Sequence, residues 1–169
     1  MDGQGWGLAC NVIHHLDEFA ALAGTTDISI DVSGLEPSYV PSKRAGYVEL
    51  IGLIRARAAD GSIFEAICRD GPPGDRTVTV ETPDASAVVA QQAATLTVSS
   101  GGRSRTMPIE IPLQSRITAE HVRALLSGRA PALPDYENAA AVHRPMIAAF
   151  LDHLRRTRPD ETFDECPIT

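Results

Sequence analysis

Cysteines and long apolar runs are both scarce in this chain of 169 residues, and each scarcity excludes a class of protein. The three cysteines, Cys10, Cys68 and Cys166, are far apart, odd in number and without a CxxC pair, which argues against a disulfide framework or a zinc site. No apolar run reaches the roughly 18 residues that a membrane span needs. The first residues lack the basic and apolar stretches of a secretory signal, so we expect a cytoplasmic protein.

Lysine is almost absent, since Lys43 is the single lysine among 15 basic residues. The formal net charge of −7 argues against a nucleic-acid partner, for which a basic surface is expected. An apolar fraction of 43% and a charged fraction of 22% are ordinary for a soluble globular protein. We therefore expect a single domain over residues 1–169, with no bound metal and no contact with a membrane.

Hydrophobic periodicity divides the chain into an opening helix, a β-rich middle and two closing helices. The spacing predicts the first helix over residues 8–23, closed by Gly24. Its expected apolar arc contains Leu8, Val12, Leu16, Phe19, Leu22 and Ala23. Alternation predicts about six strands, placed at residues 28–32, 47–57, 63–69, 78–80, 96–98 and 107–111.

The closing helices are expected over residues 119–127, capped by Thr118 and Gly128, and over residues 136–156. The last helix should be bent at Pro145. Its expected apolar stripe contains Ala139, His143, Ile147, Phe150, Leu151 and Leu154. A turn at Asp60-Gly61 and the short turns elsewhere predict mostly antiparallel pairing. The fold class is therefore α+β, a mostly antiparallel open sheet with helices packed on one face and the other face available for oligomerisation.

The opening helix also carries the strongest chemical signal. Asn11, His14 and Asp17 are spaced by three, so their side chains can meet on the side opposite the apolar arc. A histidine beside a carboxylate is a suitable general base, although the same polar face could simply be solvated. His15 falls inside the apolar arc and is expected to contact the core.

The segment Gly5-Trp6-Gly7-Leu8-Ala9-Cys10-Asn11-Val12-Ile13-His14-His15-Leu16-Asp17 resembles the start of the C-terminal domain of Gfo/Idh/MocA oxidoreductases. There, a glycine-led turn enters a helix bearing a His-x-x-Asp pair, which His14 and Asp17 match. Cys10 stands where the family often has a further aspartate. Three more stretches resemble a subgroup found in bacterial cell-surface sugar pathways: residues 42–49, residues 113–118, and the ending at residues 133–137, 143–145 and 166–169.

The resemblance implies that an N-terminal Rossmann domain binds NAD or NADP and supplies a Glu-Lys-Pro motif. This chain contains neither that motif nor a strand–GxGxxG–helix, and Gly3-x-Gly5-x-Gly7 is not expected to bind a dinucleotide because no βαβ unit surrounds it. NAD(P) would therefore act only through a missing Rossmann domain or a separate one on a partner chain.

The resemblance gives His14 the acid–base role, with Asp17 as its orienter or as a support of the helix. The substrate-binding candidates are Trp6, Asn11, Lys43, Arg44, Gln114 and His143. Gln114 and His143 rest on the resemblance alone, and His143 could equally be a buried structural residue. Trp6 could stack on a sugar ring or pack at a domain edge. Lys43 and Arg44 could bind an anion or sugar hydroxyls, or lie in a solvated turn.

Three functions are compatible with these residues. The first is the substrate-binding and oligomerisation part of an NAD(P)-dependent sugar or nucleotide-sugar oxidoreductase, incomplete as an enzyme alone. The second is a non-catalytic module that binds a sugar-like small molecule or assembles as a homo-oligomer through the sheet. The third is a cofactor-free lyase or isomerase that uses His14.

Overall fold

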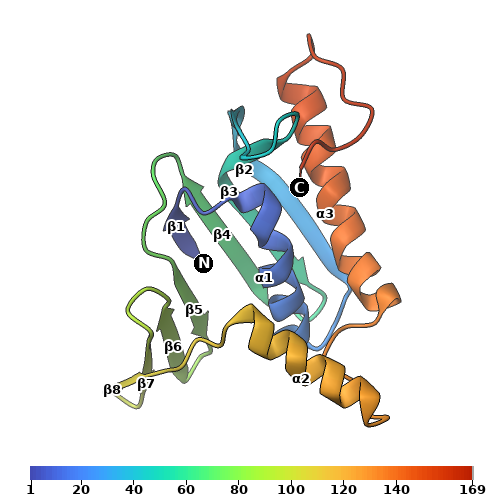
Figure 1. Cartoon of the computed structure of the whole chain (residues 1–169). Helices are drawn as coiled ribbons and strands as arrows, with labels where there is room; N and C mark the ends of the chain where they lie inside the picture. The colour runs from blue at the N-terminus through green and yellow to red at the C-terminus, as the bar shows by residue number, and fades with distance from the viewer. Residues whose placement is uncertain (169) are drawn as a thin grey trace. The chain divides into compact units, whose positions relative to one another are not determined.

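The computed structural model describes residues 1–168, which fall into two compact units. The first unit combines Met1–Arg76 with the chain from Tyr136 onward, and the second is Thr77–Asp135. Figure 1 traces the helices and strands of both along the chain.

The first unit has four strands and two helices. They are β1 (Asp2–Gln4), α1 (Leu8–Ala23), β2 (Ile28–Pro41), β3 (Val48–Ala58), β4 (Ile63–Arg69) and α3 (Tyr136–Thr157). Its strands lie in the order β2-β3-β4-β1. Antiparallel pairing joins β2 to β3 and β3 to β4, whereas β1 runs parallel to β4.

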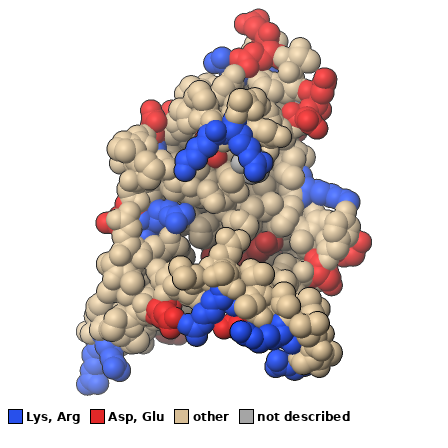
Figure 2. Space-filling model, viewed as in Figure 1, with Lys and Arg blue, Asp and Glu red and all other residues tan. Residues whose placement is uncertain are grey.

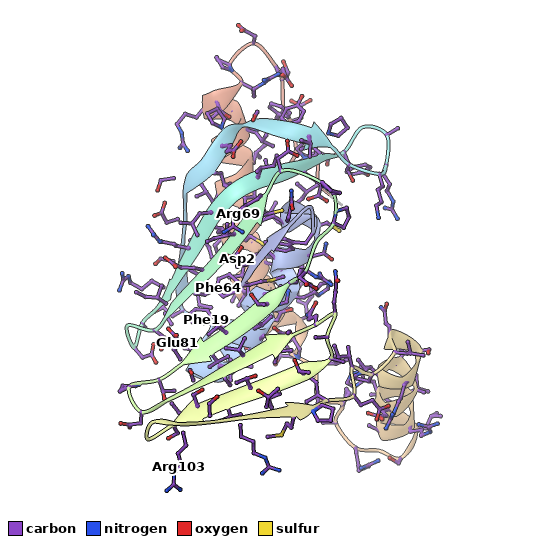
Figure 3. The ribbon with its side chains drawn as sticks, turned by 90° about the vertical axis from the view of Figure 1, so that its left-hand side faces the viewer. Asp2, Phe19, Phe64, Arg69, Glu81 and Arg103 are labelled. Atoms are coloured by element: carbon purple, nitrogen blue, oxygen red, sulfur yellow. The ribbon has the colours of Figure 1, made fainter. Side chains whose placement is uncertain are left out.

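Both helices of this unit cover the same face of its strands (Figures 1 and 3). Helix α1 packs on β3 and β4, α3 packs on β2, and the two helices contact each other. The largest fully buried side chains come from α1, β3 and α3: Leu8, Val12, Leu16, Leu50, Ile54, Val142, Met146, Phe150 and Leu154. The predicted arrangement of helices on one face is thus confirmed here.

The second unit is an antiparallel meander followed by a helix. Its elements are β5 (Thr77–Glu81), β6 (Ala85–Ala90), β7 (Thr95–Ser100), β8 (Arg103–Pro108) and α2 (Gln114–Leu126). Each strand pairs with the next along the chain. Glu81 and Arg103, labelled in Figure 3, lie exposed at strand ends of this meander.

The predicted α+β class and the mostly antiparallel pairing are confirmed. Helix α1 spans the predicted residues, and Gly24 follows it in the left-handed conformation, with φ of 68°. The hairpin at Asp60-Gly61 is also present, because β3 and β4 flank it and Ala58 pairs with Ser62.

Several predicted boundaries are wrong. Strands β1 and β6 were not predicted, and the Ala and Val residues of β6 do not alternate regularly with polar ones. Helix α2 begins at Gln114, so Thr118 lies inside it and Leu113 occupies the N-cap position. The strand expected to reach residue 111 ends at Pro108.

Two predicted apolar faces are also partly wrong. Leu22, assigned to the buried arc of α1, is 70% exposed in the last turn of that helix. In α3 the buried side is turned away from Ile147 and instead contains Val142, Met146 and His153. The imidazole Nε2–H of His153 is positioned to donate to the carbonyl oxygen of Glu36 at 3.0 Å, which ties α3 to β2. Among residues 1–168, no helix is both long and apolar enough to cross a bilayer.

The two leucines of α1 provide a stability test within one helix. Leu16→Ala should lower the free energy of unfolding by about 2–5 kcal/mol, because Leu16 is fully buried and its removal leaves a cavity. Leu22→Ala should change it by no more than about 0.5 kcal/mol. Urea unfolding followed by circular dichroism measures both, and equal losses would contradict the described packing of α1.

Candidate functional site

Helix α1 begins without a capping side chain of its own. Its N-cap residue, Gly7, is in the left-handed conformation with φ of 72° and has no side chain that could accept hydrogen bonds from the first-turn amides. The cap comes from β3 instead, where Oε2 of Glu49 accepts a hydrogen bond from the Ala9 amide at 3.0 Å. The Cys10 amide also donates to this carboxylate. Glu49 therefore satisfies helix donors that would otherwise be unpaired.

The Glu49 carboxyl is half-buried, and its burial raises the pKa above the usual glutamate value. The two amide hydrogen bonds act in the opposite direction, because they favour the ionised form. A side chain at position 7 would crowd this arrangement. A Cβ on Gly7 would lie 3.2 Å from Oε1 of Glu49 and 3.0 Å from Nδ2 of Asn11.

A pocket of about 600 Å³ opens beside this helix start, entirely within the first unit. The residues lining it come from the turn into α1, the first turn of α1, the end of β2 and the turn after it, the start of β3, the end of β4 and the chain after β4. Its polar or reactive side chains are those of Cys10, Asn11, Ser42, Lys43, Arg44, Glu49, Cys68, Arg69 and Asp70, with the ring of Trp6.

One rim of the pocket is the turn between β2 and β3. The Ser42 amide donates to the Tyr47 carbonyl at 2.9 Å, and Gly46 takes φ of 86° to close the turn. Lys43 and Arg44 are exposed on this turn, and no ion pair within residues 1–168 involves either of them. Figure 2 shows basic side chains extending over this region of the surface.

The opposite rim is fixed by close backbone contacts. The Gly5 amide donates to the Arg69 carbonyl at 3.0 Å, and Nε2 of Gln4 donates to the Asp70 carbonyl at 2.8 Å. A Cβ on Gly5 would lie only 2.3 Å from the Gly71 carbonyl oxygen, so this approach requires glycine. The Arg69 guanidinium forms two hydrogen bonds with Asp2 of β1 (Figure 3), which leaves Lys43 and Arg44 as the unpaired cations of the pocket lining.

Four predicted substrate residues, Trp6, Asn11, Lys43 and Arg44, lie in the pocket lining. Trp6 is only 6% exposed; its Nε1–H donates to the Ile67 carbonyl at 2.9 Å and its ring meets His15 edge-on. This ring is thus built into the pocket wall. Nδ2 of Asn11 donates to the carbonyls of Trp6 and Gly7, each at 2.9 Å, which orients the amide at the helix start.

The predicted His14 and Asp17 are not hydrogen-bonded to each other. Oδ1 of Asp17 lies 2.8 Å from Nε2 of His143, so this pair joins α1 to α3. His14 is exposed and lies one helical turn beyond Cys10 on the same side of α1. Gln114 begins α2 in the second unit. The acid–base role of His14 and the substrate contacts of Gln114 and His143 stay predictions.

Glu49 was not predicted as a site residue. The available signal was an acidic residue near the start of a strand whose first half is otherwise apolar, between Val48 and Leu50, which are both buried. Such a carboxylate needs hydrogen-bond donors, and the nearest unpaired backbone donors belong to a helix start.

The topology of the first unit does not fit a dinucleotide-binding domain. Such a domain needs consecutive strands that lie parallel on either side of a glycine-rich helix start. Here β1 and β2 flank α1, but β3 and β4 lie between them. The first unit therefore lacks the strand arrangement of a dinucleotide-binding domain. Within residues 1–168, no group of three histidine, cysteine or acidic side chains is arranged to hold a metal ion.

No protein-family model and no curated protein sequence matches this chain. Solved structures do, at 11–15% identity, and they share its fold. Biliverdin reductase from Synechocystis has a TM-score of 0.60 at 12% identity, over 82% of this chain and 43% of the reductase. The 3-ketoreductase of Actinomadura kijaniata, in complex with TDP-benzene and NADP, has a TM-score of 0.58 at 11% identity, over 87% and 49%. UDP-N-acetylglucosamine 3-dehydrogenase from Acidithiobacillus ferrooxidans has a TM-score of 0.57 at 15% identity, over 88% and 50%.

This chain thus spans about half the length of the structures it matches, and those structures are oxidoreductases. Each match covers more than four-fifths of this chain, so the shared fold includes residues of both units.

The cap supplied by Glu49 predicts a difference between two substitutions. Glu49→Ala should lower the free energy of unfolding by about 1 kcal/mol, because the Ala9 and Cys10 amides lose their acceptor. Glu49→Gln keeps a carbonyl oxygen that can accept from Ala9 and should retain most of the stability. Thermal unfolding followed by circular dichroism at 222 nm compares them, and equal losses in the two variants would contradict the capping role.

Proposed function

We propose that this chain is the substrate-binding domain of an NAD(P)-dependent oxidoreductase of the Gfo/Idh/MocA family that acts on a sugar or nucleotide sugar. The observation that carries the proposal is the pocket at the start of α1, where two unpaired cations and several hydrogen-bonding groups face one cavity. The fold shared with oxidoreductases supports a nucleotide-sugar substrate. One of these structures is named for UDP-N-acetylglucosamine, and another is in complex with TDP-benzene.

The chemistry of the lining suits a nucleotide sugar better than a simple apolar ligand. Lys43 and Arg44 could bind a diphosphate, since guanidinium and ammonium groups are the usual partners of phosphate oxygens. Asn11 and Glu49 offer polar atoms of the kind that bind sugar hydroxyls. The volume of about 600 Å³ lies within the usual range for small-molecule sites.

His14 would be the acid–base group, one helical turn beyond the part of α1 that lines the pocket. It is exposed, and it follows Cys10 of the pocket lining by one helical turn. Its imidazole is therefore accessible to a group outside this chain. Asp17 would support it indirectly, because the contact of Asp17 with His143 fixes this part of α1 against α3.

The nicotinamide cofactor would be bound by residues outside these 169, on another segment or chain. The topology of β1, α1 and β2 supports this division, since it does not match a dinucleotide-binding unit. The chain alone would then bind substrate without turning it over.

Binding of a nucleotide sugar to the full chain tests the proposal. Isothermal titration calorimetry should show binding of UDP-N-acetylglucosamine and of UDP. The double substitution Lys43→Ala, Arg44→Ala should weaken both by about tenfold or more, because charge-assisted hydrogen bonds to the diphosphate are lost.

A matched control removes two exposed arginines elsewhere, by Arg103→Ala with Arg105→Ala on β8. This variant should bind both nucleotides as the unchanged chain does. An unchanged chain that binds neither nucleotide, nor other sugar nucleotides at millimolar concentration, would contradict the proposal.

The cysteines provide a second, independent test. Cys10 lies partly exposed in the pocket, Cys68 is 3% exposed, and burial raises the pKa of the Cys166 thiol to about 11. Iodoacetamide reacts with thiolates, so at pH 8 Cys166 should be labelled slowly. UDP-N-acetylglucosamine should slow the labelling of Cys10 and leave that of Cys166 unchanged, as followed by peptide mass spectrometry. Labelling of Cys10 that is insensitive to saturating ligand would place the ligand elsewhere.

A further inference from the structure

The carboxylate of Glu49 has two oxygens in different situations. Oε2 accepts the Ala9 amide hydrogen bond at 3.0 Å and is committed to the start of α1. Oε1 lies 3.2 Å from the position that a Cβ on Gly7 would take, and Nδ2 of Asn11 lies 3.0 Å from the same position. Glu49 also lines the pocket. One carboxylate thus both caps the helix start through Oε2 and belongs to the pocket lining.

We infer that Glu49 is a specificity-determining residue of this pocket, whose Oε1 accepts a hydrogen bond from a hydroxyl group of the bound sugar. This inference rests on the proposed function and adds the residue that recognises the sugar rather than the nucleotide.

The surroundings of Glu49 favour a neutral hydroxyl donor over a cation. Within residues 1–168 no arginine, lysine or histidine forms an ion pair with Glu49, and its charge is met by the amides of Ala9 and Cys10 at a helix N-terminus. The positive end of the helix dipole already offsets part of that charge. Oε1 can still accept a strong hydrogen bond from an O–H group.

The same charge orients the ligand. A diphosphate beside the Glu49 carboxylate would be repelled, whereas Lys43 and Arg44 on the β2–β3 turn attract it. A nucleotide sugar would therefore bind with its diphosphate toward the β2–β3 turn and its sugar toward the start of α1. Asn11, oriented by two hydrogen bonds at the same helix start, would lie beside the sugar.

The experiment compares UDP-N-acetylglucosamine with UDP on the full chain and on Glu49→Gln. The amide of the variant can cap α1 with its oxygen, while its NH₂ replaces the acceptor at Oε1 with a donor. We expect the dissociation constant for UDP-N-acetylglucosamine to rise by about tenfold or more, and that for UDP to stay unchanged. Glu36→Gln, an exposed change of the same charge on β2 outside the pocket lining, should affect neither.

The outcomes separate the two proposals. If the unchanged chain and Glu49→Gln bind UDP-N-acetylglucosamine equally, the role of Glu49 is overturned and the nucleotide-sugar pocket stands. If Glu49→Gln weakens UDP as much as UDP-N-acetylglucosamine, the carboxylate acts on the whole pocket and the inference is likewise overturned. If the unchanged chain binds neither ligand, the proposed function falls and the role of Glu49 falls with it.

A measurement on the unchanged chain covers the case in which Glu49→Gln does not fold. The amides of Ala9 and Cys10 donate to Glu49, so their ¹⁵N–¹H resonances report a new donor at Oε1. UDP-N-acetylglucosamine should shift both resonances well beyond the shift caused by UDP. Equal shifts from the two ligands would overturn the inference without any substitution.

Discussion

The hydrogen bonds between the Glu49 carboxylate and the first amides of α1 are the contact on which the pocket depends. They cross 40 positions of sequence and hold the helix start against β3. A carboxylate is costly to bury, and the raised pKa of Glu49 reflects that cost. The helix start offsets it, because unpaired amides and the helix dipole both favour negative charge there. Since the chain enters the helix through Gly7 in a left-handed conformation, no Cβ intervenes between the strand carboxylate and the helix.

The pocket therefore contains two regions of opposite charge that arise from different causes. Glu49 is fixed by backbone donors, whereas Lys43 and Arg44 project from a turn closed by its own backbone hydrogen bonds. The chain carries a net charge of −7, so an anionic ligand is repelled by the molecule as a whole and must be attracted locally. Asp2 neutralises Arg69, so the local attraction of an anion depends on Lys43 and Arg44 of the β2–β3 turn.

Features that depend on local interactions could be predicted from the sequence, whereas contacts between residues far apart in the sequence could not. The bounds of α1 and its end at Gly24 were predictable, because the apolar period and the left-handed glycine are local signals. Lys43 and Arg44 were identified through a resemblance, and the structure places them in the pocket lining. The partner of Asp17 was not predictable, because spacing along α1 pointed to His14 while His143 on α3 lies 126 positions away. Glu49 was missed for the same reason, since no local pattern shows which helix start a strand carboxylate will meet.

This arrangement explains why glycine is needed at positions 5 and 7. In a dinucleotide-binding domain, glycines between a strand and a helix let phosphate approach the helix N-terminus. Here protein groups, not phosphate, lie next to these glycines. The Gly71 carbonyl lies beside Gly5, and the Glu49 carboxylate lies beside Gly7. A carboxylate at that position excludes a phosphate by charge, so the helix start of α1 is closed to the anion that such glycines usually admit. What the helix start can still bind is a neutral hydrogen-bond donor such as a hydroxyl group.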